Sequence, residues 1–115
     1  ANTASQEWTF MVESRDGIAL LYPRNYPNPF EEATTVAFTL TRGSSVSIEV
    51  YDTAMRLVVQ LKNNQYMEAG EHQVRWDGKT AGASDDLARG VYFCQIIVES
   101  SLKPEYGLLK MALTR

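Results

Sequence analysis

Alternation of apolar and polar residues constrains the fold of this chain more than any other feature of its sequence. In the segment 34–40, the side chains of Val36, Phe38 and Leu40 fall on one face, and the residues between them fall on the other. The segment 45–51 repeats this pattern around Ile48. A period of two places successive side chains on opposite faces of a β-strand. Both segments are therefore predicted to be strands with one buried face.

Turn residues separate further runs with the same period, and no segment shows a convincing helical period. Four more strands are predicted on this basis, at 57–61, 73–76, 91–99 and 108–113. Short strands joined by turns are typical of two packed antiparallel sheets. The sequence therefore predicts an all-β fold, an immunoglobulin-like (Ig-like) antiparallel β-sandwich of about seven strands.

A stiff turn, Asn-Tyr-Pro-Asn-Pro-Phe at 25–30, precedes the first of these strands. Each proline fixes its own φ and disfavours the α region for the residue before it, here Tyr26 and Asn28. We expect a rigid, kinked segment whose two aromatic residues, Tyr26 and Phe30, close one end of the core. The other predicted core determinants are Phe38, Ile48, Trp76 and Cys94.

The first 17 residues do not continue this pattern. Trp8 and Phe10 share one face of a short strand, 7–12, and a polar link, 13–17, follows it. That strand is expected either to close a preceding module or to add an edge strand to a domain at 18–115. No apolar run approaches the ~20 residues that cross a bilayer. The chain shows no export signal of its own, so an exported parent protein would carry that signal upstream.

Catalysis and tight metal binding find little support in the composition. The 115 residues carry a net charge of −3, which argues weakly against nucleic acid as a partner. A single cysteine, Cys94, excludes an internal disulfide, and a single histidine, His72, lies on a half-exposed strand with no nucleophile motif nearby. We predict no enzyme, no cofactor and no metal site. Acidic pairs at 31–32 and 85–86 are interpreted as solvated, with a weak Ca²⁺ site near Asp77, Asp85 and Asp86 as the alternative.

Aromatic residues leave a carbohydrate-binding module open as another alternative. Trp76 alternates with Val74 and precedes a tight turn, which favours a place in the core. A flat, exposed pair of Trp8 and Tyr66 would favour sugar stacking instead. A structural or adhesive Ig-like module is the third class considered.

Six short motifs follow one another in a defined order: NYPNPF at 25–30, VYD at 50–52, AGEH at 69–72, WDG at 76–78, GVYF at 90–93 and KMAL at 110–113. In this order and spacing they resemble the C-terminal sorting domain of type IX secretion cargo, which is related to the Ig-like domain of flagellar hook-capping proteins. The long connection 99–105 is similar to that of sorting domains found behind gingipain-type surface peptidases. The resemblance covers 21–115.

The resemblance implies a function and a set of recognition residues. A parent protein would be exported across the outer membrane of a Gram-negative bacterium to the cell surface or medium. The partners would be the outer-membrane secretion and processing machinery and the parent's upstream domains, with removal of the sorting domain expected near 13–17. The family's three motifs fall on Pro27, Asn28 and Pro29, on Gly90 and Tyr92, and on Lys110 with the terminal Arg115. An uncovered edge strand is also expected to allow weak homo-association.

Physical roles can be assigned to these motifs. Glycine at position 90 permits a positive φ, and Tyr92 combines an apolar ring with a hydroxyl that can reach a backbone group. Lys110 alternates with Leu109 and Met111, so its ammonium is predicted to point outward. Met55 occupies a position where the family usually carries glycine, and we expect the hairpin there to be reshaped.

Overall fold

The computed structural model describes residues 18–79, 87–100 and 103–114. The predicted strand at 7–12 with Trp8, the link at 13–17, Asp85, Asp86 and Arg115 lie outside the described residues. Seven strands are present: β1 (Leu20–Tyr26), β2 (Thr34–Leu40), β3 (Ser44–Tyr51), β4 (Leu57–Met67), β5 (Gly70–Trp76), β6 (Gly90–Glu99) and β7 (Pro104–Leu113). None of the described residues forms a helix that is long and apolar enough to span a membrane.

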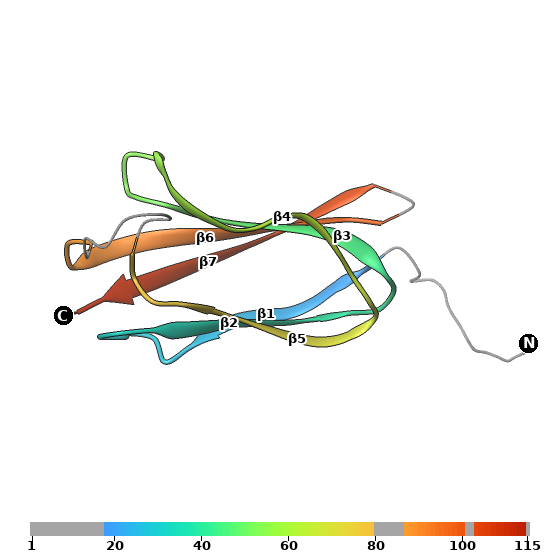
Figure 1. Cartoon of the computed structure of the whole chain (residues 1–115), viewed down its shortest axis with the longest axis horizontal. Helices are drawn as coiled ribbons and strands as arrows, with labels where there is room; N and C mark the ends of the chain where they lie inside the picture. The colour runs from blue at the N-terminus through green and yellow to red at the C-terminus, as the bar shows by residue number, and fades with distance from the viewer. Residues whose placement is uncertain (1–17, 80–86, 101–102, 115) are drawn as a thin grey trace, which may run out of the picture.

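The strands form two packed sheets (Figure 1). One sheet has the order β1-β2-β5, the other has the order β4-β3-β6-β7, and all neighbouring strands are antiparallel. Non-consecutive neighbours, β2 with β5 and β3 with β6, give the Greek-key connections of an Ig-like sandwich. The predicted all-β sandwich is confirmed.

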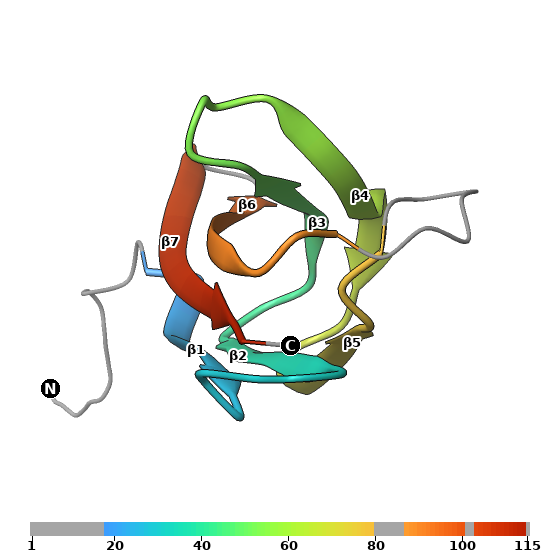
Figure 2. The ribbon, with the colours of Figure 1, turned by 90° about the vertical axis from the view of Figure 1, so that its left-hand side faces the viewer.

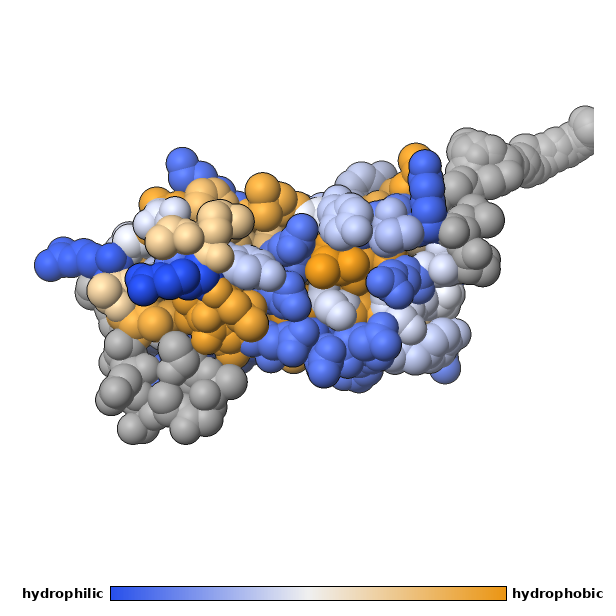
Figure 3. Space-filling view, turned by 90° about the horizontal axis from the view of Figure 1, so that it is seen from above, coloured by the Kyte–Doolittle hydropathy of each residue, from blue (hydrophilic) through white to orange (hydrophobic). Residues whose placement is uncertain are grey.

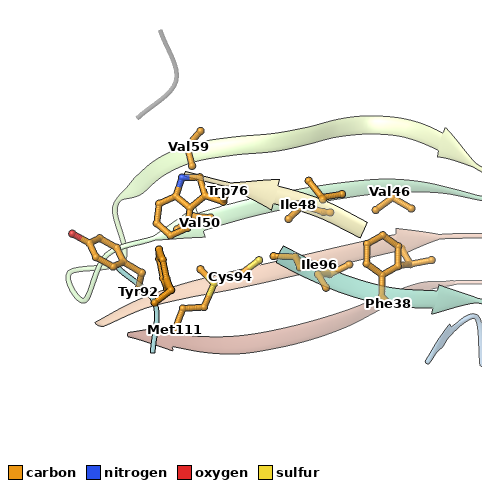
Figure 4. Packing of buried hydrophobic residues seen from close by; sticks show 14 of the residues in the cluster. Phe38, Val46, Ile48, Val50, Val59, Trp76, Tyr92, Cys94, Ile96 and Met111 are labelled. Atoms are coloured by element: carbon orange, nitrogen blue, oxygen red, sulfur yellow. The ribbon is translucent and has the colours of Figure 1, made fainter. Parts of the chain in front are cut away.

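The core lies between the two inner faces, as the alternation predicts. Val36 lies opposite Val74 across β2 and β5, and Ile48 lies opposite Ile96 across β3 and β6. Side chains from both sheets meet in one cluster (Figure 4). Five of the six predicted core determinants are buried in it: Phe30, Phe38, Ile48, Trp76 and Cys94.

Tyr26 is the exception, and its prediction as a core residue is wrong. Its side chain is 44% exposed. Tyr26 lies opposite Thr35, whose neighbour Val36 points inward, so Tyr26 and Thr35 share the outer face of the sheet. There its hydroxyl accepts a hydrogen bond from Gln73 Nε2 at 3.0 Å. Of the two aromatics that bracket the turn, only Phe30 enters the core.

The strand β1 was not predicted, because its residues break the period of two. Pro23 lies inside it, Tyr22 has a positive φ of 54°, and the register shifts between Leu21 and Arg24. Proline is tolerated where a strand lies at the edge of a sheet or at a bulge, and β1 meets both conditions. The remaining differences are lengths: β4, β5 and β7 extend beyond the predicted segments.

The hairpin between β3 and β4 keeps the left-handed geometry, so the expected reshaping around Met55 is wrong. Met55 has a φ of 63°. Asp52 Oδ1 stabilises the turn by accepting bonds from the backbone N–H groups of Ala54 (2.9 Å) and Arg56 (3.0 Å). Hydrogen bonding to the Arg56 backbone is the main cause that lowers the pKa of Asp52. The turn therefore tolerates methionine where glycine would be less strained.

Candidate recognition site at the end of the last strand

Asn28 connects the proline-rich turn to the last strand. Its Nδ2 donates to the carbonyl of Lys110 at 3.0 Å, and its Oδ1 accepts from the N–H of Ala112 at 3.1 Å. The side-chain amide thus offers β7 one donor and one acceptor, as a peptide group of a neighbouring strand would. Although 82 residues separate Asn28 from Lys110 in sequence, the two motifs are in direct contact.

Phe30 extends this contact with its own backbone. Its N–H donates to the carbonyl of Ala112 at 2.9 Å, and its carbonyl accepts from the N–H of Thr114, also at 2.9 Å. These bonds form a parallel bridge between Phe30 and Leu113. The end of β7 is consequently bonded on both sides, to β6 and to the turn (Figure 2).

Hydrogen bonds within the turn hold it in place. Thr34 is buried at the start of β2, and its hydroxyl donates to the carbonyl of Pro27 at 2.8 Å. Asn25 Nδ2 donates to the same hydroxyl oxygen at 3.1 Å. Both prolines follow cis peptide bonds and are exposed. The turn presents two proline rings to solvent while Phe30 enters the core.

The second motif, on β6, pairs with the same end of β7. Gly90 lies opposite Leu113, and Tyr92 lies opposite Met111. Gly90 has a φ of 146°, a region that L side chains rarely adopt, which fits its predicted role. The Tyr92 hydroxyl donates to the carbonyl of Ala88 at 2.6 Å, so its predicted backbone partner is present.

Three aromatic rings pack against one another in the core next to these contacts. The ring centroids of Phe30 and Trp76 lie 5.7 Å apart, and those of Trp76 and Tyr92 lie 5.8 Å apart. Trp76 is 2% exposed, and its Nε1 donates to the carbonyl of Lys79 at 3.0 Å. Figure 4 shows Trp76 and Tyr92 at the same end of the core as Met111. This packing fixes the turn, β6 and β7 relative to one another.

Lys110 is exposed on the outer face of β7, as predicted, while Leu109 and Met111 point inward. It lies opposite Phe93 of β6. No carboxylate among the described residues forms an ion pair with its ammonium. On the same face, Tyr106 is 63% exposed and Leu108 is 65% exposed. Figure 3 views the outer side of the four-stranded sheet, where apolar and charged surface alternate.

We call the turn 27–30, the start of β6 at 90–92 and the end of β7 at 110–114 the chain-end site. It contains every sequence-predicted recognition residue that lies in the described part of the chain. The contact of Asn28 with β7 has no counterpart in the sequence pattern. That pattern also did not reveal Glu105, whose carboxylate accepts from the N–H groups of Ala19 (2.7 Å) and Leu20 (3.0 Å) and joins β1 to β7.

The surroundings of the other candidate functional residues indicate structural roles. His72 Nε2 lies 2.7 Å from the carbonyl oxygen of Glu68, and its ring packs 5.6 Å from Phe38. Cys94 is fully buried, and burial raises the pKa of its thiol to about 12. Within the described ranges, no three acidic, histidine or cysteine residues gather as metal ligands. Tyr66 is 65% exposed, whereas Trp76 is buried and unavailable for stacking on a sugar.

A comparison with known protein families assigns the chain to one of them. The family model described as "Secretion system C-terminal sorting domain" matches residues 24–104, well over half of its length. The chain belongs to this family. It is a non-catalytic C-terminal sorting domain for type IX secretion, and such domains direct proteins to the surface of Gram-negative bacteria. The predicted family, export route and location are confirmed.

Two solved structures from Porphyromonas gingivalis share the fold of this sorting domain. Dimeric latent PorU matches with a TM-score of 0.68 and 24% identity over 86% of the chain and 10% of PorU. PorZ, a surface component of the type IX secretion system, matches with a TM-score of 0.53 and 23% identity over 81% of the chain and 11% of PorZ. The chain thus spans about a tenth of either protein. None of the curated proteins compared with the chain matches it.

Proposed function

We propose that the outer-membrane secretion machinery binds the chain-end site of this sorting domain. One observation carries the proposal: three motifs distant in sequence meet at the last residues of β7, through Asn28, Phe30, Gly90 and Tyr92. At their junction Lys110 presents a cation that has no partner among the described residues. A receptor could then recognise the folded domain by binding the exposed charge of Lys110 and the surface beside it.

The test is export of a fluorescent reporter fused upstream of the whole chain, in bacteria with and without a working type IX system. We expect system-dependent delivery to the surface or medium, and at least a tenfold loss with Lys110→Glu. The matched control is Lys103→Glu, which makes the same charge change at an exposed residue before β7. Equal delivery of both variants, each shown to be folded, would remove Lys110 from the recognition step. Retention of the unchanged fusion in both strains would refute the proposed function.

We further propose that the machinery separates the domain from its upstream partner after export, at the polar link 13–17. The reason is chemical: this link, Glu-Ser-Arg-Asp-Gly, has no apolar side chain to bury. Mass spectrometry of the surface-delivered reporter would locate its new C-terminus. A reporter that retains the intact chain at the surface would contradict this step.

A further inference from the structure

The backbone of β7 has two edges, and their hydrogen-bonding groups can be assigned from the contacts of the chain-end site. Ala112 directs its N–H toward Asn28 and its carbonyl toward Phe30, so it faces away from β6. The N–H and carbonyl of one strand residue point to the same edge, and successive residues alternate. The register of β6 with β7 is continuous over the whole of β7. Tyr106, Leu108 and Lys110 therefore also direct their backbone groups to the outer edge.

Along the middle of the strand, the backbone groups of this outer edge make no hydrogen bond within the described residues, although β1 packs beside β7 through Leu20, Pro23 and Glu105. The N–H groups of Tyr106, Leu108 and Lys110 and the carbonyls of Tyr106 and Leu108 have no hydrogen-bond partner among the described residues. The open stretch is limited at both ends. Pro104 has no N–H to donate, and Asn28 already occupies the carbonyl of Lys110.

The other sheet edges in the described part are less suited to accept a strand. The pairing of β4 with β3 shifts register at three places, and β1 contains a bulge. The outward residues of β5, Glu71, Gln73 and Arg75, are polar and exposed. By contrast, β7 combines an unbroken register with the exposed apolar side chains of Tyr106 and Leu108.

We propose that a component of the secretion machinery adds an extended segment to the outer edge of β7, as a fifth strand of the four-stranded sheet. Main-chain hydrogen bonds would supply affinity, as in other cases of strand addition. The segment would place apolar side chains against Tyr106 and Leu108 and a carboxylate beside the unpaired ammonium of Lys110. This inference rests on the proposed function and specifies how the machinery recognises the domain.

The first experiment uses the same reporter fusion with Leu108→Pro. Proline at this position removes an outward donor and no hydrogen bond of the β6–β7 ladder, and the preceding Gly107 has no Cβ to clash with the proline ring. Leu108→Ile is the matched control, because it keeps both the backbone N–H and an apolar side chain of the same size. We expect Leu108→Pro to reduce export at least tenfold while Leu108→Ile retains at least half. Tyr106→Pro, which removes the neighbouring outward donor, replaces Leu108→Pro if that variant fails to fold.

The outcomes of this experiment distinguish failure of strand addition from failure of the proposed function. A folded proline variant that is exported like the unchanged fusion would overturn the inference and leave the proposed function standing. Loss of system-dependent export of the unchanged fusion would overturn the proposed function itself. Loss with Leu108→Ile as well as with Leu108→Pro would show that export depends on the exact side chain and not on the backbone donor, and would overturn strand addition.

Amide hydrogen exchange of the whole chain in solution tests whether the edge is free. We expect the amides of Leu108 and Lys110 to exchange at least a hundredfold faster than the ladder amides of β6. Protection that is independent of protein concentration would show that the chain covers its own edge. Protection that rises with concentration would show pairing with a second copy. Either result would overturn the assignment of this edge to the secretion machinery.

Discussion

Asn28 acts as a substitute for a strand residue, because its amide bonds to two groups of β7 that a neighbouring peptide would otherwise occupy. A net contribution of about 0.5–1.5 kcal/mol for each bond sets the expected effect of its removal. We predict that Asn28→Ala lowers the free energy of unfolding by about 1–2 kcal/mol, measured by urea denaturation. Asn63→Ala, at an exposed asparagine of β4, is the control and should change it by less than about 0.5 kcal/mol. Equal effects would mean that the bonds to β7 contribute nothing.

Gly90 and Gly70 allow backbone strain to be separated from recognition. Both have a positive φ, and a Cβ added at either would meet nothing within 4 Å. We therefore expect Gly90→Ala and Gly70→Ala each to destabilise the domain by about 1–3 kcal/mol, measured by urea denaturation. Only Gly90 belongs to the chain-end site, so export of the reporter should fall further for Gly90→Ala. Equal export of the two variants would limit Gly90 to a folding role.

The buried thiol of Cys94 predicts a pH dependence of stability. Its pKa is raised from 9.0 to about 12 in the folded chain by burial. The folded state therefore holds a proton that the unfolded state loses, and stability decreases as the pH rises from about 9 to 12. We expect this decrease to be steeper than in Cys94→Ala by up to about 1.4 kcal/mol per pH unit, measured by urea denaturation. Identical slopes would show that the thiol ionises without unfolding.

Among the elements, β1 depends on a contact with β7 as well as on its pairing with β2. The carboxylate of Glu105 accepts the N–H groups of Ala19 and Leu20. We predict that Glu105→Gln lowers the free energy of unfolding by about 2 kcal/mol, because the amide offers one acceptor where the carboxylate offers two. Hydrogen exchange at Ala19 and Leu20 should accelerate most. Glu99→Gln, at an exposed residue opposite Pro104, is the control and should leave both measurements unchanged.

The strands that alternate cleanly could be predicted from the sequence, and the others could not. The segments now seen as β2, β3 and β6 keep one buried face along their length, which the period of two detects. Pro23 and the adjacent bulge conceal β1. The second half of β4 was missed for a different reason. Asn63, Asn64 and Gln65 are all polar and exposed, so the sequence there shows no buried face.

The candidate site was predictable as a set of residues and only partly as an arrangement. A positive φ at Gly90 and a backbone partner for the Tyr92 hydroxyl follow from local chemistry, and both are present. The pairing of Asn28 with Lys110 could not be predicted, because it joins segments 82 residues apart and no local pattern records such a contact. The wrong interpretation of Tyr26 has the same origin, since its orientation is set by pairing with β2.

At the scale of the whole molecule, the two sheets should unfold together. Leu113 is 2% exposed at the end of β7, where Phe30 from the β1–β2 connection also pairs. We predict that Leu113→Ala lowers the free energy of unfolding by about 2–5 kcal/mol, whereas Leu108→Ala, the same change at an exposed site of the same strand, stays within about 0.5 kcal/mol. Tryptophan fluorescence and amide exchange in β2 and β3 should report one transition. Separate transitions would mean that the sheets are independent units.

The bonding of Asn28 and Phe30 to the last strand has a consequence for synthesis on the ribosome. The turn emerges from the ribosome before the strand that it must bind, and translation of the intervening residues separates the two events. Until then Phe30 and its neighbours lack their partners on β7. A parent chain that ends early through a premature stop codon therefore lacks a complete chain-end site. Dependence of export on this site would then restrict export to proteins that have been translated through the end of β7.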